Sequence, residues 1–293
     1  MSPPTKTPLG SKTSLKILML HGYTQSGPLF HAKTRALHKA LTKALPTHSI
    51  HLSYPTGPVH LNPADIPGYN GPSAAEAGED MEPAYGWWRR KDMPHPTQKG
   101  ETAVVYTGLQ DGFTRIADTI AEEGPFDGVI GFSQGACAAG MVASLLEPGR
   151  RDAFSSSTSQ KDVMETEPFP TSFSSLNQPP LKFALIYSGF IAPGTRYIDF
   201  YKPSLKTPTL HFLGALDGVV EESRSQGLIE VCEGAKVVTH PGGHFLPSQR
   251  PWLDAAVGFV KECLEQVTAG DNGNNKRDTK GKEENVEDMD VPF

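Results

Sequence analysis

Five residues of this chain, Gly131-Phe132-Ser133-Gln134-Gly135, have the types and the spacing of a nucleophile elbow, G-x-S-x-G. The apolar run at residues 128–130 is typical of a buried strand, and the small residues at 135–140 indicate the start of a helix. In an elbow the serine occupies the sharp turn between such a strand and such a helix, and glycines let the two elements approach closely. The context therefore predicts that Ser133 is a nucleophile. The alternative is a serine in an ordinary turn between a strand and a helix.

Two residues further along the chain can activate such a serine. A serine hydroxyl is a weak nucleophile until a base removes its proton and a third group orients that base. Asp217 follows the apolar run at 209–213 in a turn flanked by glycines, and His244 follows the run at 236–239 after Gly242-Gly243. We predict that His244 is the general base and that Asp217 orients it.

Competing assignments exist for both partners. A turn-capping aspartate and a hydrogen-bonded structural histidine are the ordinary interpretations of such residues. Glu221 and Asp199 are weaker candidates for the acid. His240 is the weaker candidate for the base, because it continues the strand directly and precedes a proline. His211 lies inside an apolar strand and is expected to belong to the core.

Backbone N–H groups beside the serine would have to hold the oxyanion that forms during acyl transfer. One donor is expected from Gln134, the residue after the nucleophile, and the other from a loop near an early strand. The first apolar strand ends in Leu20-His21-Gly22-Tyr23, so we assign the second N–H to Tyr23, with Thr24 as the alternative. His21 is expected to brace this loop rather than to take part in catalysis.

The segment from 56 to 101 is rich in proline and glycine and has no periodicity. Because it is too long for an ordinary connection, we expect a functional, lid-like loop. It contains Trp87 and Trp88, which are either core aromatics or part of a substrate-binding pocket for an acyl chain.

The elements that would position these residues alternate between strands and helices. Strands are predicted at 15–20, 49–54, 128–130, 183–187, 209–213 and 236–239, and helices at 31–45, 109–123, 135–147, 223–233 and 251–266. This alternation predicts an α/β fold with a doubly wound, mostly parallel sheet and helices on both faces.

We expect one such domain over residues 15–267, after a flexible N-terminus at 1–14. Residues 268–293 should form a disordered, charged tail, since the part from 271 onward holds seven acids against four bases and almost no apolar residues. The Ser/Pro-rich stretch at 150–180 is expected to be a low-complexity insertion on the surface.

Composition excludes several classes of protein. With 37% hydrophobic and 20% charged residues the chain is typical of a soluble globular protein. No apolar run approaches the ~20 residues that span a bilayer, and the N-terminus lacks the apolar region of a secretory signal. Three scattered cysteines do not suggest a disulfide framework or a zinc cluster. We therefore expect no metal or other cofactor, no nucleic-acid or membrane partner, and a cytoplasmic location, with the nucleus as a further compartment.

Taken together, the motifs resemble the fungal serine hydrolases of the FSH family, a branch of the α/β hydrolases. The similarity is carried by residues 20–27, 124–135, 188–190, 214–217 and 240–244. The resemblance implies an α/β-hydrolase fold, a Ser133–Asp217–His244 triad, and hydrolysis of carboxylic esters or thioesters. Some members of that family release polyketide acyl chains from carrier proteins, and others resemble general cytoplasmic esterases.

The function expected from the sequence is therefore that of a serine esterase that cleaves esters of small or medium acyl chains through an acyl-enzyme. An acyl-carrier or CoA thioesterase is the alternative, because its chemistry is the same. A hydrolase-fold binding protein with little turnover is the third possibility. The expected partners are a small-molecule ester or acyl thioester and, for the thioesterase, an acyl carrier protein.

Overall fold

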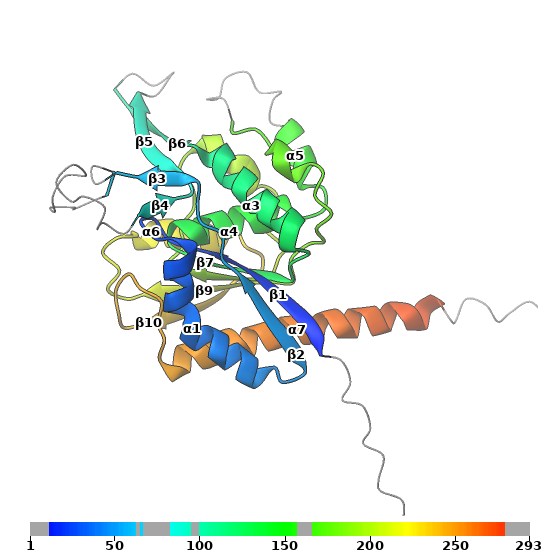
Figure 1. Ribbon diagram of the computed structural model, residues 1–293. Helices are drawn as coiled ribbons and strands as arrows, with labels where there is room; N and C mark the ends of the chain where they lie inside the picture. The colour runs from blue at the N-terminus through cyan, green and yellow to red at the C-terminus, as the bar shows by residue number, and fades with distance from the viewer. Residues whose placement is uncertain (1–11, 63–64, 67–82, 95–99, 157–165, 279–293) are drawn as a thin grey trace, which may run out of the picture.

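A parallel sheet of six strands lies at the centre of the molecule, in the order β10-β9-β8-β7-β1-β2 (Figure 1). The computed structural model describes residues 12–62, 65–66, 83–94, 100–156 and 166–278. The strands are β1 (Thr13–Leu20), β2 (His48–Ser53), β7 (Gly128–Phe132), β8 (Phe183–Tyr187), β9 (Thr209–Gly214) and β10 (Lys236–His240). Because all six run in the same direction, the loops that follow them meet at one edge of the sheet.

Helices cover both faces of this sheet. They are α1 (Gly27–Ala44), α3 (Leu109–Glu123), α4 (Gln134–Leu145), α5 (Arg150–Ser156), α6 (Glu222–Glu230) and α7 (Arg250–Asp278), with short 3₁₀ turns η4 (Thr171–Phe173) and η5 (Thr195–Phe200). Side chains of α1 and α7 form the core on one face, and those of α3, α4 and α6 form the core on the other. Alternate residues of β1 enter the two cores, as the period of a strand requires: Ile17 and Met19 one, Leu18 and Leu20 the other.

The helices follow from local sequence features. The N-cap of α1 is Ser26, whose hydroxyl accepts a hydrogen bond from Leu29 N–H at 3.3 Å, so this helix begins before the expected residue 31. One stripe of α3 is buried, including Leu109, Phe113 and Ile116. All twelve residues of α4 are buried, which explains why its sequence is small and apolar on every side.

The segment from 56 to 101 is not the single irregular loop that the sequence suggested. Its described parts contribute to two antiparallel ribbons: β3 (Val59–Leu61) pairs with β4 (Ala84–Gly86), and β5 (Arg89–Pro94) pairs with β6 (Thr102–Thr107), which directly follows the segment. Figure 1 shows the β5–β6 ribbon extending away from the body of the molecule. The strand pattern was missed because β5 is exposed and charged and therefore shows no alternation. Residues 63–64, 67–82 and 95–99 of the lid-like loop expected over 56–101 lie outside the described residues.

The stretch at 150–180 is anchored in the core at both ends, so the prediction of a surface insertion is wrong there. Phe154 and Phe173 are buried, and Phe154 packs edge-on against Phe169 with ring centroids 5.3 Å apart. The Ser/Pro-rich composition hid these aromatic anchors. Residues 157–165 lie outside the described part of the chain.

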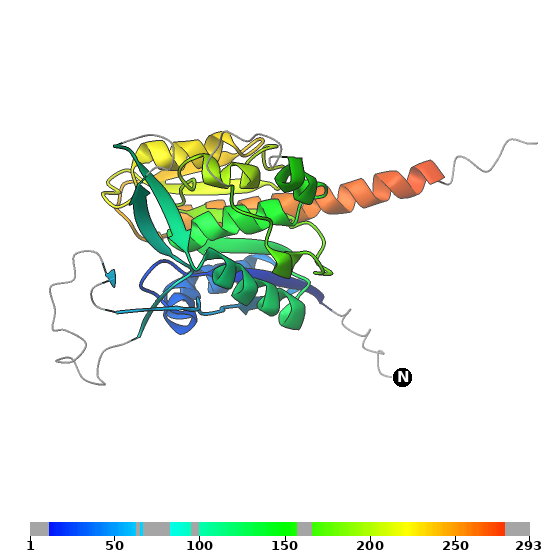
Figure 2. The same cartoon turned by 90° about the horizontal axis from the view of Figure 1, so that it is seen from above.

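Helix α7 continues to Asp278, twelve residues past the expected end at 266, so the tail predicted from 268 onward begins as a helix. Figure 2 shows its C-terminal part projecting beyond the body. Extending an existing helix needs no new nucleus, so even poor helix formers can continue it. Residues 1–11 and 279–293, where flexibility was expected, lie outside the described residues. Within the described ranges, no helix combines the length and hydropathy needed to cross a bilayer.

Candidate active site

Ser133 lies in the sharp turn between β7 and α4, in the backbone conformation expected of an elbow. Its φ of 53° is positive, which is unusual for a residue with a side chain and typical of functional turns. Neither neighbouring glycine has room for a larger residue. A Cβ on Gly131 would lie 2.2 Å from the carbonyl oxygen of Gly135, and one on Gly135 would lie 2.1 Å from that of Leu20.

Ser133, His244 and Asp217 form one chain of hydrogen bonds. The distance from His244 Nε2 to Ser133 Oγ is 2.8 Å, and His244 Nδ1 lies 2.8 Å from Asp217 Oδ2. The carboxylate accepts a hydrogen bond from Nδ1–H, so Nε2 carries the lone pair that faces the serine hydroxyl. The three side chains predicted from the sequence are therefore brought together in the geometry that proton transfer from serine needs.

Asp217 is held as a carboxylate. Burial alone would raise its pKa, but hydrogen bonds from Val220 N–H, His244 and Val219 N–H outweigh burial and lower that pKa overall. The two backbone bonds reach Oδ1 at 2.9 and 3.0 Å and leave Oδ2 for the imidazole. A carboxylate that stays charged can orient the imidazole and stabilise its protonated form.

The loops after β9 and β10 are tied together, which brings the acid to the histidine. Ala215 N–H donates to the carbonyl of His240 at 2.8 Å, and Leu216 N–H donates to that of Gly242 at 3.0 Å. A Cβ on Gly214 would lie only 2.4 Å from the Gly243 carbonyl oxygen, so glycine permits this approach. The competing base, His240, is buried, and its Nδ1 accepts a bond from Gly242 N–H at 3.2 Å.

The structure also brings together the two segments predicted to supply the oxyanion donors. Gln134 is the first residue of α4, so its N–H has no partner within the helix. The ring of Tyr23 and the side-chain oxygen of Gln134 flank Gly86: a Cβ there would lie 2.8 Å from the ring and 3.2 Å from that oxygen. The loop after β1 and the elbow therefore meet at β4.

Trp87 and Trp88 belong to the core, which corrects the prediction that they bind substrate. Trp87 is fully buried and Trp88 is 2% exposed, so neither indole offers a surface for an acyl chain. Trp88 stacks on Tyr106 with ring centroids 4.9 Å apart. The irregular sequence around them gave no sign that β4, directly before Trp87, leads both indoles into the core.

Sequence reasoning assigned no role to Ser188, which follows β8 as Ser133 follows β7. The two preceding residues, Phe132 and Tyr187, are paired in register, so the serines end neighbouring strands. Ser188 also has a positive φ, 47°, and its buried hydroxyl has no hydrogen-bond partner among the described atoms. Together with Asp217 it lines a pocket of about 310 Å³. Its place directly after a buried strand was the available signal.

Three apolar side chains are exposed on the loops that carry Asp217 and His244. Leu216 is 75% exposed, Val219 67% and Phe245 43%. Large apolar residues were visible in these glycine-rich loops from the sequence, but their exposure was not. We call these three residues the apolar rim.

Comparison with known proteins gives a consistent result. A family model described as "Serine hydrolase (FSH1)" matches residues 11–256. Esterase OVCA2 of Danio rerio is 30% identical over 255 residues, covering 86% of this chain and 98% of the relative. Family of serine hydrolases 2 of Saccharomyces cerevisiae is 31% identical over 265 residues, covering 86% and 98%.

Longer relatives and solved structures extend this result. A Schizosaccharomyces pombe protein named dihydrofolate reductase is 35% identical over 249 residues, covering 84% of this chain but 47% of the relative. The chain spans about half the length of the first two curated relatives that it matches, this one and an S. pombe hydrolase of which it covers 51%. Acyl-protein thioesterase 2 of Zea mays has a similar fold, with a TM-score of 0.51 at 17% identity, covering 88% of this chain and 97% of that structure.

Proposed function

Because the chain belongs to the serine hydrolase (FSH1) family, we propose that it cleaves carboxylic esters of small or medium acyl chains through Ser133, His244 and Asp217. Family membership and the α/β-hydrolase fold, both predicted from the sequence, are confirmed by the family match, the relatives and the parallel sheet. The hydrolytic activity proposed here is of the kind for which the esterase relatives are named. The observation that carries the proposal is the unbroken hydrogen-bond chain from the Ser133 hydroxyl through His244 to Asp217.

In the acylation step His244 Nε2 takes the proton of the Ser133 hydroxyl while Oγ forms a bond to the acyl carbon. The electron pair of the carbonyl double bond moves onto its oxygen, and the backbone N–H groups of Gln134 and Tyr23 stabilise this oxyanion. When the intermediate collapses, the bond to the alcohol breaks, and His244 gives the proton to the departing oxygen.

In the deacylation step a water molecule takes the place of the alcohol. His244 removes one proton from the water, and the resulting oxygen adds to the acyl carbon of the acyl-enzyme. Collapse breaks the bond to Ser133 Oγ, which recovers its proton from His244. The products are a carboxylic acid and a free enzyme in its starting protonation state.

The apolar rim is our proposed contact for the acyl chain. It lies on the same two loops as Asp217 and His244, and two of its members, Leu216 and Phe245, are the chain neighbours of these triad residues. Covering such surface with a methylene chain removes apolar area from water and favours binding. A water-soluble ester with a short or medium chain fits this arrangement.

An acyl thioesterase is the second candidate. The same three groups can cleave a thioester. Ser133 then attacks the thioester carbonyl, and His244 gives its proton to the departing thiol instead of to an alcohol. The apolar rim suits the acyl chain of either substrate. The Zea mays acyl-protein thioesterase shares the fold, but at 17% identity this likeness does not indicate which substrate the present chain cleaves.

Covalent labelling and a rate panel test the proposal. A fluorophosphonate probe should label the wild-type protein and leave Ser133→Ala unlabelled. Rates on p-nitrophenyl esters from two to ten carbons, measured beside acyl-CoA thioesters of equal chain length, distinguish the two candidates. Labelling that persists in Ser133→Ala contradicts the nucleophile, and an unlabelled wild-type protein favours the binding-protein alternative.

A further inference from the structure

We propose that the side chains of Gln134 and Trp87 are positioning residues that join the two oxyanion donors into one rigid unit. This inference rests on the proposed function, since it concerns how the Gln134 and Tyr23 N–H groups are held. Gln134 and Trp87, with His21, form a buried network that we call the oxyanion brace. None of the three contacts the reacting atoms through its side chain.

The first half of the brace holds the elbow. The side-chain oxygen of Gln134 accepts a hydrogen bond from Trp87 N–H at 2.8 Å, and its side-chain NH₂ donates to the Trp88 carbonyl at 2.9 Å. Both bonds are buried, and both partners are backbone groups of the segment between β4 and β5. A side chain that is held at both polar atoms has one orientation, so the residue that carries the first oxyanion N–H is fixed from its side-chain end.

The second half of the brace holds the loop after β1. The Trp87 indole Nε1–H donates to the backbone carbonyl of His21 at 2.8 Å. The centroids of the indole and of the His21 imidazole lie 4.9 Å apart. The His21 carbonyl belongs to the loop that leads directly into Gly22 and Tyr23. Trp87 therefore reaches Gln134 with its backbone and the Tyr23 loop with its indole, and one residue contacts both halves of the oxyanion hole.

The His21 ring completes the network as a neutral imidazole. Its Nε2 accepts a hydrogen bond from Gly57 N–H at 2.9 Å, so Nδ1 carries the proton that is donated to the Gly22 carbonyl at 2.8 Å. Burial lowers the pKa of His21 to about 4, which keeps this pattern of donor and acceptor at neutral pH. The brace thus also fixes the peptide unit immediately before Tyr23.

The surroundings leave the brace little freedom to move. A Cβ on Gly112 would lie 2.4 Å from the Trp87 carbonyl oxygen, and one on Gly57 would lie 2.5 Å from that of Gly86. The β4–β5 segment is therefore packed against α3 and the loop after β2 at the point where it holds both donors. Oxyanion donors act through fixed placement, so small displacements reduce the rate without preventing substrate binding.

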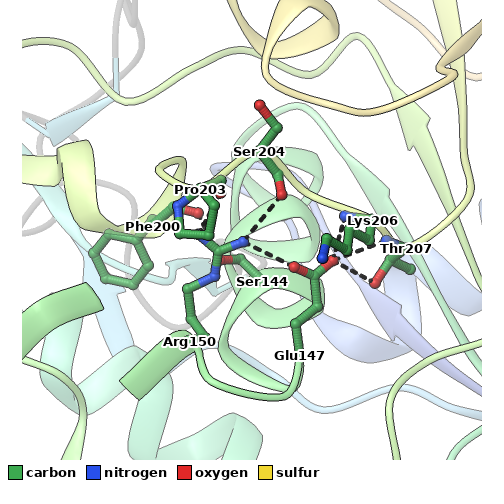
Figure 3. Close-up of polar contacts among 8 residues, drawn as sticks. All are labelled: Ser144, Glu147, Arg150, Phe200, Pro203, Ser204, Lys206 and Thr207. Carbon is green, nitrogen blue, oxygen red and sulfur yellow. Dashed lines mark hydrogen bonds and ion pairs between the residues drawn. The ribbon is translucent and has the colours of Figure 1, made fainter. Parts of the chain in front are cut away.

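Two variants and one matched control test the brace. Trp87→Phe removes the indole donor and retains an aromatic ring, and Gln134→Met removes both side-chain hydrogen bonds at similar size. The control is Ser144→Ala, also in α4, which removes a buried hydrogen bond to the Phe200 carbonyl far from the elbow (Figure 3). Measurements are kcat and KM on p-nitrophenyl butyrate, Tm, and the affinity for a butyryl trifluoromethyl ketone, whose adduct with serine carries an oxyanion.

Both brace variants should lower kcat about 10- to 100-fold, with KM within about twofold of wild type. The affinity for the trifluoromethyl ketone should fall by a similar factor. Ser144→Ala should lower Tm by as much as either variant while leaving kcat and ketone affinity unchanged. This pattern separates positioning from a general loss of stability.

The proposal is overturned if Trp87→Phe and Gln134→Met lower Tm while the folded protein keeps wild-type kcat and ketone affinity. It is also overturned if Ser144→Ala reduces kcat and ketone affinity as strongly as the two brace variants do. If one variant fails to fold, the other decides. Failure of the proposed function is a different result: the wild-type protein would not react with the fluorophosphonate probe.

Discussion

Hydrogen-bonded charged side chains lie near both ends of α4, yet they differ in what they can do. At the N-terminal end the Asp217 carboxylate acts through His244 on the Ser133 hydroxyl. Just past the C-terminal end, Glu147 and Arg150 form an ion pair of 2.8 Å whose side chains are 8% and 1% exposed. Figure 3 shows this second cluster.

At the C-terminal cluster the Glu147 carboxylate and the terminal nitrogens of Arg150 are bound by other parts of the fold, while Arg150 Nε has no hydrogen-bond partner among the described atoms. Glu147 Oε1 accepts bonds from the backbone of Lys206 at 2.6 Å and of Thr207 at 2.8 Å, and from the Thr207 hydroxyl at 3.0 Å. Arg150 donates to the carbonyls of Pro203 and Ser204. These bonds connect the end of α4 to the segment that leads into β9, and the hydroxyl among them, that of Thr207, faces a carboxylate rather than an imidazole. At the N-terminal end the last acceptor, His244 Nε2, faces a hydroxyl. A buried charge serves chemistry only where its final partner can react.

Replacing the base should have the largest effect. We expect His244→Ala to lower kcat by roughly 10⁴- to 10⁶-fold, and Ser133→Ala combined with it to be little worse, because the triad acts as a unit. Esterase kinetics of the three proteins measure this. His240→Ala is the control and should keep most of the activity. If the two histidine variants exchanged effects, the assignment of the base would be wrong.

Breaking the other cluster should affect stability instead. Glu147→Gln leaves the buried Arg150 charge without its counter-ion, and we expect a loss of about 3–5 kcal/mol in the free energy of unfolding. Urea denaturation measures this loss. The folded fraction should retain wild-type kcat/KM. Reduced kcat/KM with unchanged stability would remove the distinction between the two ends of α4.

Acid should destabilise the folded protein through buried histidines. Burial lowers the pKa of His21, beside the active site, and of His211, in β9, from 6.5 to about 4. Between these values the unfolded chain binds protons that the folded protein does not, so the free energy of unfolding falls as the pH drops from 6.5 to 4. Each histidine should contribute roughly 3 kcal/mol, fully present above pH 6.5.

His211→Leu tests this pH dependence away from the chemistry. The variant removes one of the buried imidazoles whose pKa is lowered, so its stability should fall less steeply than that of wild type over the same pH range. Urea denaturation at several pH values gives the slope, and kcat/KM at pH 7 should match wild type. A slope equal to that of wild type would show that His211 does not contribute.

The smallest effects are expected at the apolar rim. Leu216→Ser should reduce kcat/KM more for long than for short acyl chains, by up to about 0.8 kcal/mol for each methylene that loses contact. Val237→Ser is the matched control, because Val237 is also exposed, at 45%, but lies on β10 away from the triad loops. An equal loss at all chain lengths would show that Leu216 does not contact the acyl chain.

Much of the active site could be predicted because its signals are local. The spacing of Gly131, Ser133 and Gly135 identifies an elbow within five residues, and only glycine fits at its tight contacts. Asp217 and His244 each follow an apolar strand, and parallel strands bring their following loops to one edge. His244 was chosen over His240 because it follows two glycines, whereas His240 continues a strand and precedes a proline. The hydrogen bonds of His244 to Ser133 and Asp217 agree with this choice.

Other features could not be predicted because local composition was misleading. The strand β5 is exposed on a ribbon, so its charged sequence carries no inward-facing pattern. Phe154 and Phe173 anchor a stretch whose serines and prolines suggested a surface loop. The helical part of α7 beyond residue 266 contains glycine and asparagine, and it depends on the helix that precedes it.

By itself, the sequence determined the family, the alternation of strands and helices, and which serine, acid and histidine could act together. Those features depend on short spacings and on side-chain chemistry. Only the tertiary structure decided the position of Trp87, the ion pair of Glu147 with Arg150 and the place of Ser188 beside the nucleophile. The bond from Trp87 to His21 joins residues 66 positions apart, and that from Gln134 to Trp88 spans 46. Such pairs are selected by the packing of the whole fold, because no local pattern specifies which distant backbone group a buried side chain will meet.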